Sequence, residues 1–243
     1  MAVAYVRDTG LGVSANFSGT TTKSFLALPA VGNHVFAGIA LYQSTNNPAI
    51  AAVTDNQSGN TYVENVETEA AGSADCSATI YSVKVVGSTG TFTLTADPDA
   101  ASNNYIAWAG VEFSGLNATT HLDRTGVNSS TSSAGDATVT ASLANTTNNG
   151  VALAVASVSN GDTDINIGDT PPAGYTNVIV NEDSETYVGF SLAYKIYSGS
   201  ETSSAPFTHD NVSQSGWAAV IATYKEASVA GATSPGWAGG GWW

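Results

Sequence analysis

The sequence predicts an all-β protein, a jelly-roll-like antiparallel β-sandwich built from two pseudo-repeated halves. Segments of four to ten residues rich in Val, Ile, Thr, Tyr and Phe alternate apolar with polar side chains, and Gly, Asn, Asp and Pro separate them. This is the pattern of half-buried strands between turns. No stretch shows the 3.6-residue period of an amphipathic helix. Several strand-like segments of the first half recur in the same order in the second half.

The first half begins its regular strands at residues 33–42, where Val35, Ala37, Ile39 and Leu41 occupy alternate positions. Alternate side chains of a strand lie on one face, so this face is expected to be buried. Three more strands are predicted at residues 78–85, 91–94 and 105–113. The last, around Val111, is nearly continuous in apolar or small residues, which is typical of a central strand covered on both faces.

The second half repeats these four strands, at residues 149–158, 191–197, 206–209 and 216–224. The alignment pairs Tyr81 with Tyr194 and Val83 with Ile196. The alternation predicts one inward face in each of two strands, consisting of Val151, Leu153 and Val155, and of Val188, Phe190, Leu192, Tyr194 and Ile196. The closing strand around Ile221 is again almost wholly apolar and is expected at the centre of a sheet.

Composition divides the chain into four parts. Residues 1–116 form the first sandwich half and residues 136–226 the second, with a Ser-, Thr- and Asn-rich connecting loop at 117–135 and a Gly/Trp-rich tail at 227–243. The halves either form separate sandwiches or interleave as one two-sheet jelly roll. We favour two pseudo-equivalent halves packed into one β-sandwich unit.

Charge and targeting signals exclude several classes of function. Charged residues make up 11% of the chain and the net charge is −14, which argues against nucleic acid and against an anionic membrane surface as partners. No apolar run has the length of a membrane span, and the first eight residues lack the features of a signal peptide. We expect a protein made in the host cytoplasm and assembled into a virion; a mature extracellular protein is the alternative.

The sequence holds no catalytic motif, so no enzyme and no cofactor is expected. The only cysteine, Cys76, starts an apolar strand and is predicted to be a buried, inert thiol. His34 and His209 lie beside turn residues and are expected to face solvent. The cluster from His121 to Asp123 and Arg124 suggests an Asp–Arg ion pair that pins a loop.

Glu112 interrupts an apolar strand. A buried, functional carboxylate is one interpretation of this position. The favoured interpretation places Glu112 on a solvent-exposed face together with Trp108 and Gly110.

Two weak binding signals concern metals and sugars. Asp162, Asp164 and Asp169 are the candidates for calcium, but no Glu closes the loop at EF-hand spacing, so a solvated acidic loop is favoured and no metal is expected. Exposed aromatic rings serve β-sandwich modules as sugar-stacking platforms. The candidates for glycan stacking are Tyr42, Tyr62, Tyr175 and Tyr187, with Tyr197 as a fifth.

The tail at 227–243 carries three of the five tryptophans, Trp237, Trp242 and Trp243, and the glycines 239–241. Glycine runs favour neither helix nor strand, whereas indoles gain much from burial. The tail is therefore predicted to dock its indoles on a neighbouring subunit rather than on its own sandwich. A passive extension is the alternative.

Several segments together resemble a recurrent β-sandwich module of bacteriophage virion proteins and of large bacterial surface or secreted proteins. They lie at residues 171–178, 190–196, 207–208 and 217–224, with sibling forms at 53–62 and 107–115. The resemblance covers roughly residues 20 to 226. It implies a non-catalytic scaffold or adhesion role and supplies no functional residues.

The sequence thus favours a structural component of a bacteriophage particle, either a head decoration (cement) protein or a tail or fibre component. It would dock through its termini on copies of itself and on other virion proteins, as a homo-oligomer. The alternative is a secreted or cell-surface carbohydrate-binding or adhesion module whose partners are glycans.

Overall fold

The computed structural model describes residues 2–43, 49–70, 76–99, 104–131, 137–140, 144–145, 149–159, 167, 170–181, 187–208 and 216–228. Within these ranges the chain forms β-strands and turns, and the strands pair antiparallel throughout. The predicted all-β antiparallel class is confirmed. The same ranges hold no helix of the length and apolarity that crossing a bilayer requires.

The first main sheet has the strand order β1-β9-β4-β7-β6, and β2 also pairs with β9. Its strands are β1 (Ala4–Asp8), β2 (Gly12–Phe17), β4 (His34–Gln43), β6 (Val63–Ala70), β7 (Cys76–Lys84) and β9 (Asn104–Ser114). A small sheet of order β3-β8-β5 accompanies it. It consists of β3 (Thr21–Ser24), β5 (Ile50–Asp55) and β8 (Thr93–Pro98).

The second main sheet has the order β10-β16-β12-β14-β13, and the pair β11-β15 accompanies it. Its strands are β10 (Leu122–Ser130), β12 (Asn149–Ser159), β13 (Thr176–Asn181), β14 (Val188–Ser198) and β16 (Gly216–Lys225). The small pair consists of β11 (Ala137–Thr140) and β15 (Ser204–Phe207).

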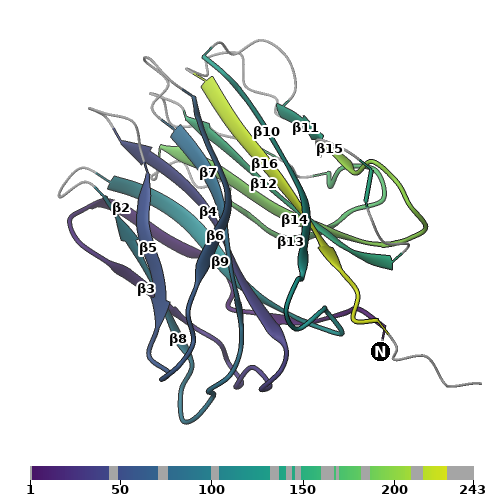
Figure 1. Ribbon diagram of the computed structural model, residues 1–243. Helices are drawn as coiled ribbons and strands as arrows, with labels where there is room; N and C mark the ends of the chain where they lie inside the picture. The colour runs from purple at the N-terminus through teal and green to yellow at the C-terminus, as the bar shows by residue number, and fades with distance from the viewer. Residues whose placement is uncertain are drawn as a thin grey trace, which may run out of the picture.

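The two main sheets lie face to face and share one core (Figure 1). Phe36, Ile80 and Val111 reach this core from the first sheet, and Val155 and Leu192 reach it from the second. Alternate residues of β14 therefore point inward, as predicted, through Val188, Phe190, Leu192 and Tyr194. Ile196 is the exception, because it lies near the end of the strand and is 46% exposed.

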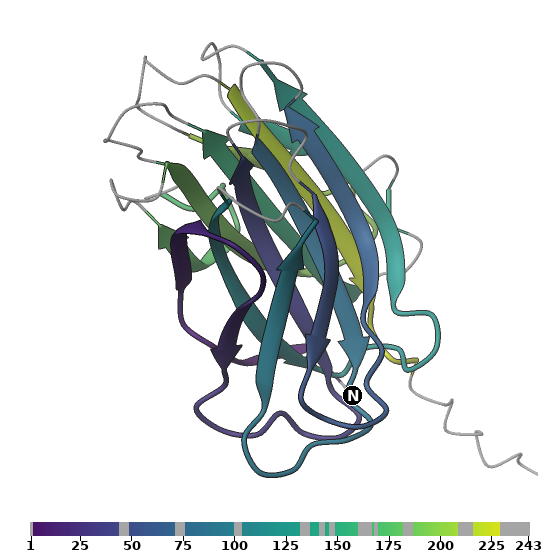
Figure 2. The same ribbon diagram turned by 90° about the vertical axis from the view of Figure 1, so that its left-hand side faces the viewer.

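A second apolar layer lies on the outer face of each main sheet. The small sheet β3-β8-β5 covers the first main sheet (Figure 2), and Leu94 of β8 is buried with Ile39 and Trp108. On the other side, Phe207 of β15 is buried with Trp217 and Ile221 of β16. The central strands are thus covered on both faces, which explains why their sequences are nearly continuous in apolar and small residues.

The strands that the sequence alignment paired occupy corresponding places in the two main sheets. β4 and β12 each lie between the strands paired in the alignment, β7 and β9 in one sheet and β14 and β16 in the other. The residue register is wrong for two pairs. Tyr81 packs in the outer core and Tyr194 against the shared core, and likewise Val35 lies in the outer core whereas Val151 lies in the shared core. A shift of one residue moves a side chain to the opposite face. The pseudo-repeat itself stays a prediction.

The connecting region contains a strand that the sequence did not reveal. The composition of residues 117–135 predicts a loop, but β10 pairs along its length with β16 at the edge of the second main sheet. Its Ser-, Thr- and Asn-rich composition suits an edge strand with side chains in solvent, such as Val127, which is 54% exposed. Apart from β10 itself, each main sheet draws its described strands from one side of this region.

Candidate functional site

Glu112 on β9 is buried, and the favoured expectation of a solvent-exposed face is wrong. Its side chain has no exposed surface, because the face that it shares with Trp108 is covered by the outer layer. The carboxylate Oε2 lies 2.8 Å from Nε of Arg7 on β1. Oε1 accepts hydrogen bonds from the backbone N–H of Ala30 at 2.8 Å and from Nδ2 of Asn33 at 2.6 Å.

These contacts hold the segment 25–33, called here the apolar loop. Its two ends are also fixed by backbone hydrogen bonds: Phe25 N–H donates to Phe92 O at 3.0 Å, and Gly32 N–H donates to Val85 O at 2.8 Å. Gly32 has a φ of 95°, which an L-residue with a side chain rarely adopts. The loop conformation is therefore specified both at its ends and by the buried carboxylate.

Three apolar side chains of this loop project into solvent. Leu26 is 100% exposed, Val31 65% and Leu28 40%. A cavity of about 320 Å³, called here the edge cavity, lies beside the loop between Leu26 and the edge strand β1, where Tyr5 and Arg7 line it. Exposed apolar side chains on a fixed backbone next to an open strand edge form a surface suited to protein contacts.

The buried His34 pairs with the half-buried His121 between the two main sheets. The expectation that His34 faces solvent is wrong: it has no exposed surface, and its ring lies 4.5 Å, centroid to centroid, from that of His121. His121 also stacks on Tyr224 of β16, and its Nε2 lies 2.9 Å from Oγ of Ser82 on β7.

Burial governs the protonation of this pair. Desolvation is the main cause that lowers the pKa of His34 to about 3, and the nearby positive charges of His121 and Lys84 contribute to the same shift. Desolvation also lowers the pKa of His121. Both imidazoles are therefore neutral at pH 7, and they serve as packing groups where β4 meets β16.

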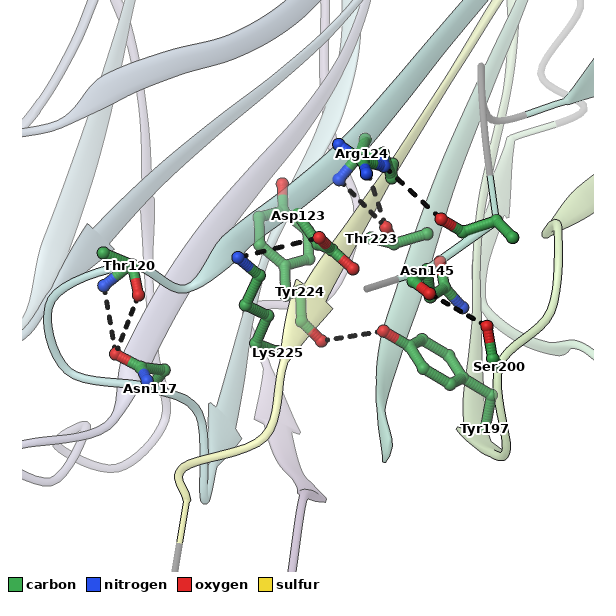
Figure 3. Close-up of polar contacts among 11 residues, drawn as sticks. Asn117, Thr120, Asp123, Arg124, Asn145, Tyr197, Ser200, Thr223, Tyr224 and Lys225 are labelled. Atoms are coloured by element: carbon green, nitrogen blue, oxygen red, sulfur yellow. Dashed lines mark hydrogen bonds and ion pairs between the residues drawn. The ribbon is translucent and has the colours of Figure 1, made fainter. Parts of the chain in front are cut away.

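The residues that follow His121 do not form the expected ion pair. Asp123 Oδ1 lies 3.7 Å from Nζ of Lys225, and Arg124 instead donates from Nε to the carbonyl of Ala144 at 3.4 Å (Figure 3). The prediction of an Asp123–Arg124 pair is wrong: the pairing of β10 with β16 shifts register between Leu122 and Arg124, and the two side chains take different partners. His209 lies outside the described residues.

The structure separates the glycan-stacking candidates. Tyr42 and Tyr187 come together, with ring centroids 6.5 Å apart, and Tyr105 joins them at 5.7 Å from Tyr42 and 5.0 Å from Tyr187. The three rings, called here the tyrosine cluster, are half-buried at one end of the sandwich. In contrast, Tyr175 is buried and Tyr62 packs against the outer core.

Tyr105 was missed by sequence reasoning, because its place beside Tyr42 follows from the pairing of β4 with β9, which no local pattern encodes. The apolar loop was missed as well. Its signal is an apolar run without strand alternation, ending at Pro29 and Gly32.

Two further predicted sites lie outside the described residues. Asp162, Asp164 and Asp169, and likewise Trp237, Trp242 and Trp243, lie outside the described ranges. Within those ranges no group of three His, Cys, Asp or Glu side chains is arranged to hold a metal ion. Cys76 is fully buried, as expected. Comparison with protein-family models, curated proteins and solved structures finds no match to the chain.

Proposed function

We propose that the protein is a non-enzymatic structural component of a bacteriophage particle, a head decoration (cement) protein or a tail or fibre component. It would be assembled in the host cytoplasm and dock on copies of itself and on other virion proteins. The apolar loop is the observation that supports this proposal most. The Gly/Trp-rich terminal segment provides a second contact in the same proposal.

The loop has the properties of a preorganised contact surface. Leu26 is fully exposed, yet the backbone beneath it is fixed by the buried carboxylate of Glu112. A surface that is ordered before binding loses little conformational entropy when the partner arrives. Burying an ionised carboxylate is costly unless it is paired and hydrogen-bonded, and here its partners are Arg7 and the loop itself.

The net charge makes apolar contacts more important than electrostatic attraction for association between copies. Every copy carries a net charge of −14, so copies repel one another at long range. Association of identical copies then depends on short-range burial of side chains such as Leu26 and Val31. Because apolar burial contributes about 25 cal/mol per Å², a few such side chains repeated in symmetric copies give a stable assembly.

The test uses loop variants and purified particles. We expect the double variant Leu26→Ser/Val31→Ser to keep its melting temperature but to enter particles, or associate with itself, much less than the wild type. Val63→Ser is the matched control, since Val63 is 58% exposed on β6, away from the loop. Recovery of the protein only from cell envelopes and never from particles would contradict the proposal, as would normal assembly of the loop variant.

A carbohydrate-binding or adhesion module outside the cell is the second candidate, and the tyrosine cluster favours it. Tyr42, Tyr105 and Tyr187 offer three half-buried rings within 6.5 Å of one another. Tyr187 has a φ of 53°, an unusual backbone conformation for a residue with a side chain, and such conformations gather at functional sites.

A glycan array tests this second candidate. If it is correct, binding to one class of polysaccharide is lost in Tyr105→Ala and retained in Tyr5→Ala, a control at another half-buried tyrosine whose ring stacks on Tyr194. An array without signal, recorded with protein shown to be folded, would argue against glycan binding.

A further inference from the structure

An open apolar cavity lies where the described chain leaves the second main sheet. It has a volume of about 210 Å³ and is lined in part by Val3, Ile196, Tyr197 and Glu226. Its volume equals roughly seven water molecules at about 30 Å³ each, which is room for one large side chain. We call it the end cavity.

Most of the lining of the end cavity is apolar, and the polar residues Asn149, Ser198 and Glu226 complete it. Val3 is buried, and Tyr197 is buried with its hydroxyl donating to the carbonyl of Tyr224 at 3.3 Å (Figure 3). Gly150 allows this packing, because a β-carbon there would lie 2.3 Å from the Tyr197 hydroxyl. Ile196 stands at the rim with 46% of its surface exposed, although its alternation on β14 predicted burial. The cavity therefore leaves an apolar side chain partly uncovered.

Glu226 is one of the polar residues in this lining. Oε2 of Glu226 accepts a hydrogen bond from Nδ2 of Asn149 at 2.6 Å, and a carboxylate has capacity for further donors. An occupant with a large apolar body and a single N–H donor matches these walls and this acceptor. The indole of tryptophan has that chemistry, since its ring is apolar and Nε1–H only donates.

The sequence supplies such a group next to the cavity. The described chain ends at Ser228, two residues after Glu226, and the sequence continues through Pro235 and Gly236 to Trp237. Pro followed by Gly is a sequence pattern that favours a type II turn. Nine residues reach at most about 30 Å when fully extended, so Trp237 can return to the cavity.

We propose that the end cavity is the binding site for the indole of Trp237 of the same chain, with Glu226 accepting its N–H. A segment tethered at the cavity rim has an effective concentration in the millimolar range, well above that of a second copy in dilute solution. This differs from the expectation that all three terminal indoles dock on a neighbour. It leaves Trp242 and Trp243, beyond the glycines 239–241, for that role, and it does not depend on the proposed function.

Disulfide trapping tests the proposal. The double variant Ile196→Cys/Gly236→Cys places a thiol at the rim and one beside Trp237, while Cys76 is buried and does not compete. The control Thr131→Cys/Gly236→Cys places the first thiol at an exposed position just beyond the far end of β10. We expect an intrachain disulfide in the rim pair, formed much faster than in the control. Equal rates, or a disulfide between two chains, would overturn the proposal.

Tryptophan variants give an independent readout. Trp237→Ala should lower the melting temperature and remove one solvent-protected indole N–H signal from the NMR spectrum, whereas Trp242→Ala should do neither. Trp237→Phe keeps an aromatic ring and should restore most of the melting temperature while still lacking the indole signal. An unchanged melting temperature and unchanged protected indole signals in both Trp237 variants would exclude the end cavity as its site.

Discussion

Gly38 of β4 and Leu192 of β14 meet across the two main sheets: a β-carbon on Gly38 would lie 2.9 Å from Cδ1 of Leu192. The same atom would lie 2.9 Å from Cγ2 of Val155 on β12. The glycine is therefore the position at which the first sheet makes room for side chains of the second, and it sets how closely the two halves approach.

We expect Gly38→Ala to destabilise the protein by about 1–3 kcal/mol, the usual cost of overpacking a core. Leu192→Ala should cost about 2–5 kcal/mol through the cavity that it leaves. In the double variant the new methyl group occupies part of that cavity. The stability lost in the double variant should therefore be smaller than the sum of the losses in the two single variants. Urea unfolding of the three variants provides the numbers, with the exposed Val127→Ala as the control. Strictly additive costs would mean that the two residues do not touch.

The ion pair between Arg7 and Glu112 should contribute most to the stability of the apolar loop. Arg7→Met leaves the buried carboxylate without its cation, and we expect a loss of about 3 kcal/mol, the lower end for breaking a buried pair, because Arg7 is 32% exposed. Arg124→Met is the matched control, with an expected change within about 0.5 kcal/mol. Hydrogen exchange at the Ala30 amide should also accelerate in Arg7→Met alone. Protection of that amide in both variants would show that the pair does not hold the loop.

The buried histidines predict a loss of stability in acid. The folded-state pKa of His34 is lowered from about 6.5 to about 3, so below pH 6.5 the unfolded chain takes up a proton that the folded chain does not. Stability is therefore fully present above pH 6.5 and declines as the pH falls toward 3, by at most about 1.4 kcal/mol per pH unit for this group.

His34→Phe isolates the effect of this one titration. It replaces a ring whose two nitrogens have no hydrogen-bond partner among the described residues. As the pH is lowered from 6.5 to 4, the unfolding free energy of the wild type should fall relative to that of the variant. Carboxylates common to both proteins cancel in that difference. A difference that does not change with pH would mean that His34 takes up its proton in the folded protein at the same pH as in the unfolded chain.

Cys76 should be unreactive in the folded protein. It has no exposed surface, and its Sγ lies 4.0 Å from the carbonyl of Ser157 and 3.9 Å from that of Gly216 on the facing sheet. We expect alkylation by iodoacetamide to proceed only through unfolding, and therefore to accelerate steeply at the denaturant midpoint. Rapid labelling in native buffer would show that this end of the shared core opens without global unfolding.

Local pattern was sufficient for eight of the sixteen strands in the described residues, including the central strands of both main sheets, and for several of their faces. The alternation along β14 placed Phe190 and Leu192 in the core, and the apolar composition of β9 and β16 indicated strands covered on both sides. It was not sufficient for β10, because the polar face of an edge strand has the composition of a loop. Local pattern also could not fix the residue-by-residue alignment of the two halves, because a shift of one position keeps an apolar strand apolar while it exchanges the two faces.

By itself, the sequence determined the all-β class, the positions of the central strands along the chain and the acidic, sparsely charged composition, because these follow from residue type and local period. Only the tertiary structure decided what Glu112 and His34 do. Glu112 bonds to Ala30, 82 residues away, and His34 packs on a histidine 87 positions further along the chain. Whether a polar side chain on a strand meets water or protein depends on the layer laid over it, and that layer comes from distant segments that no local period encodes.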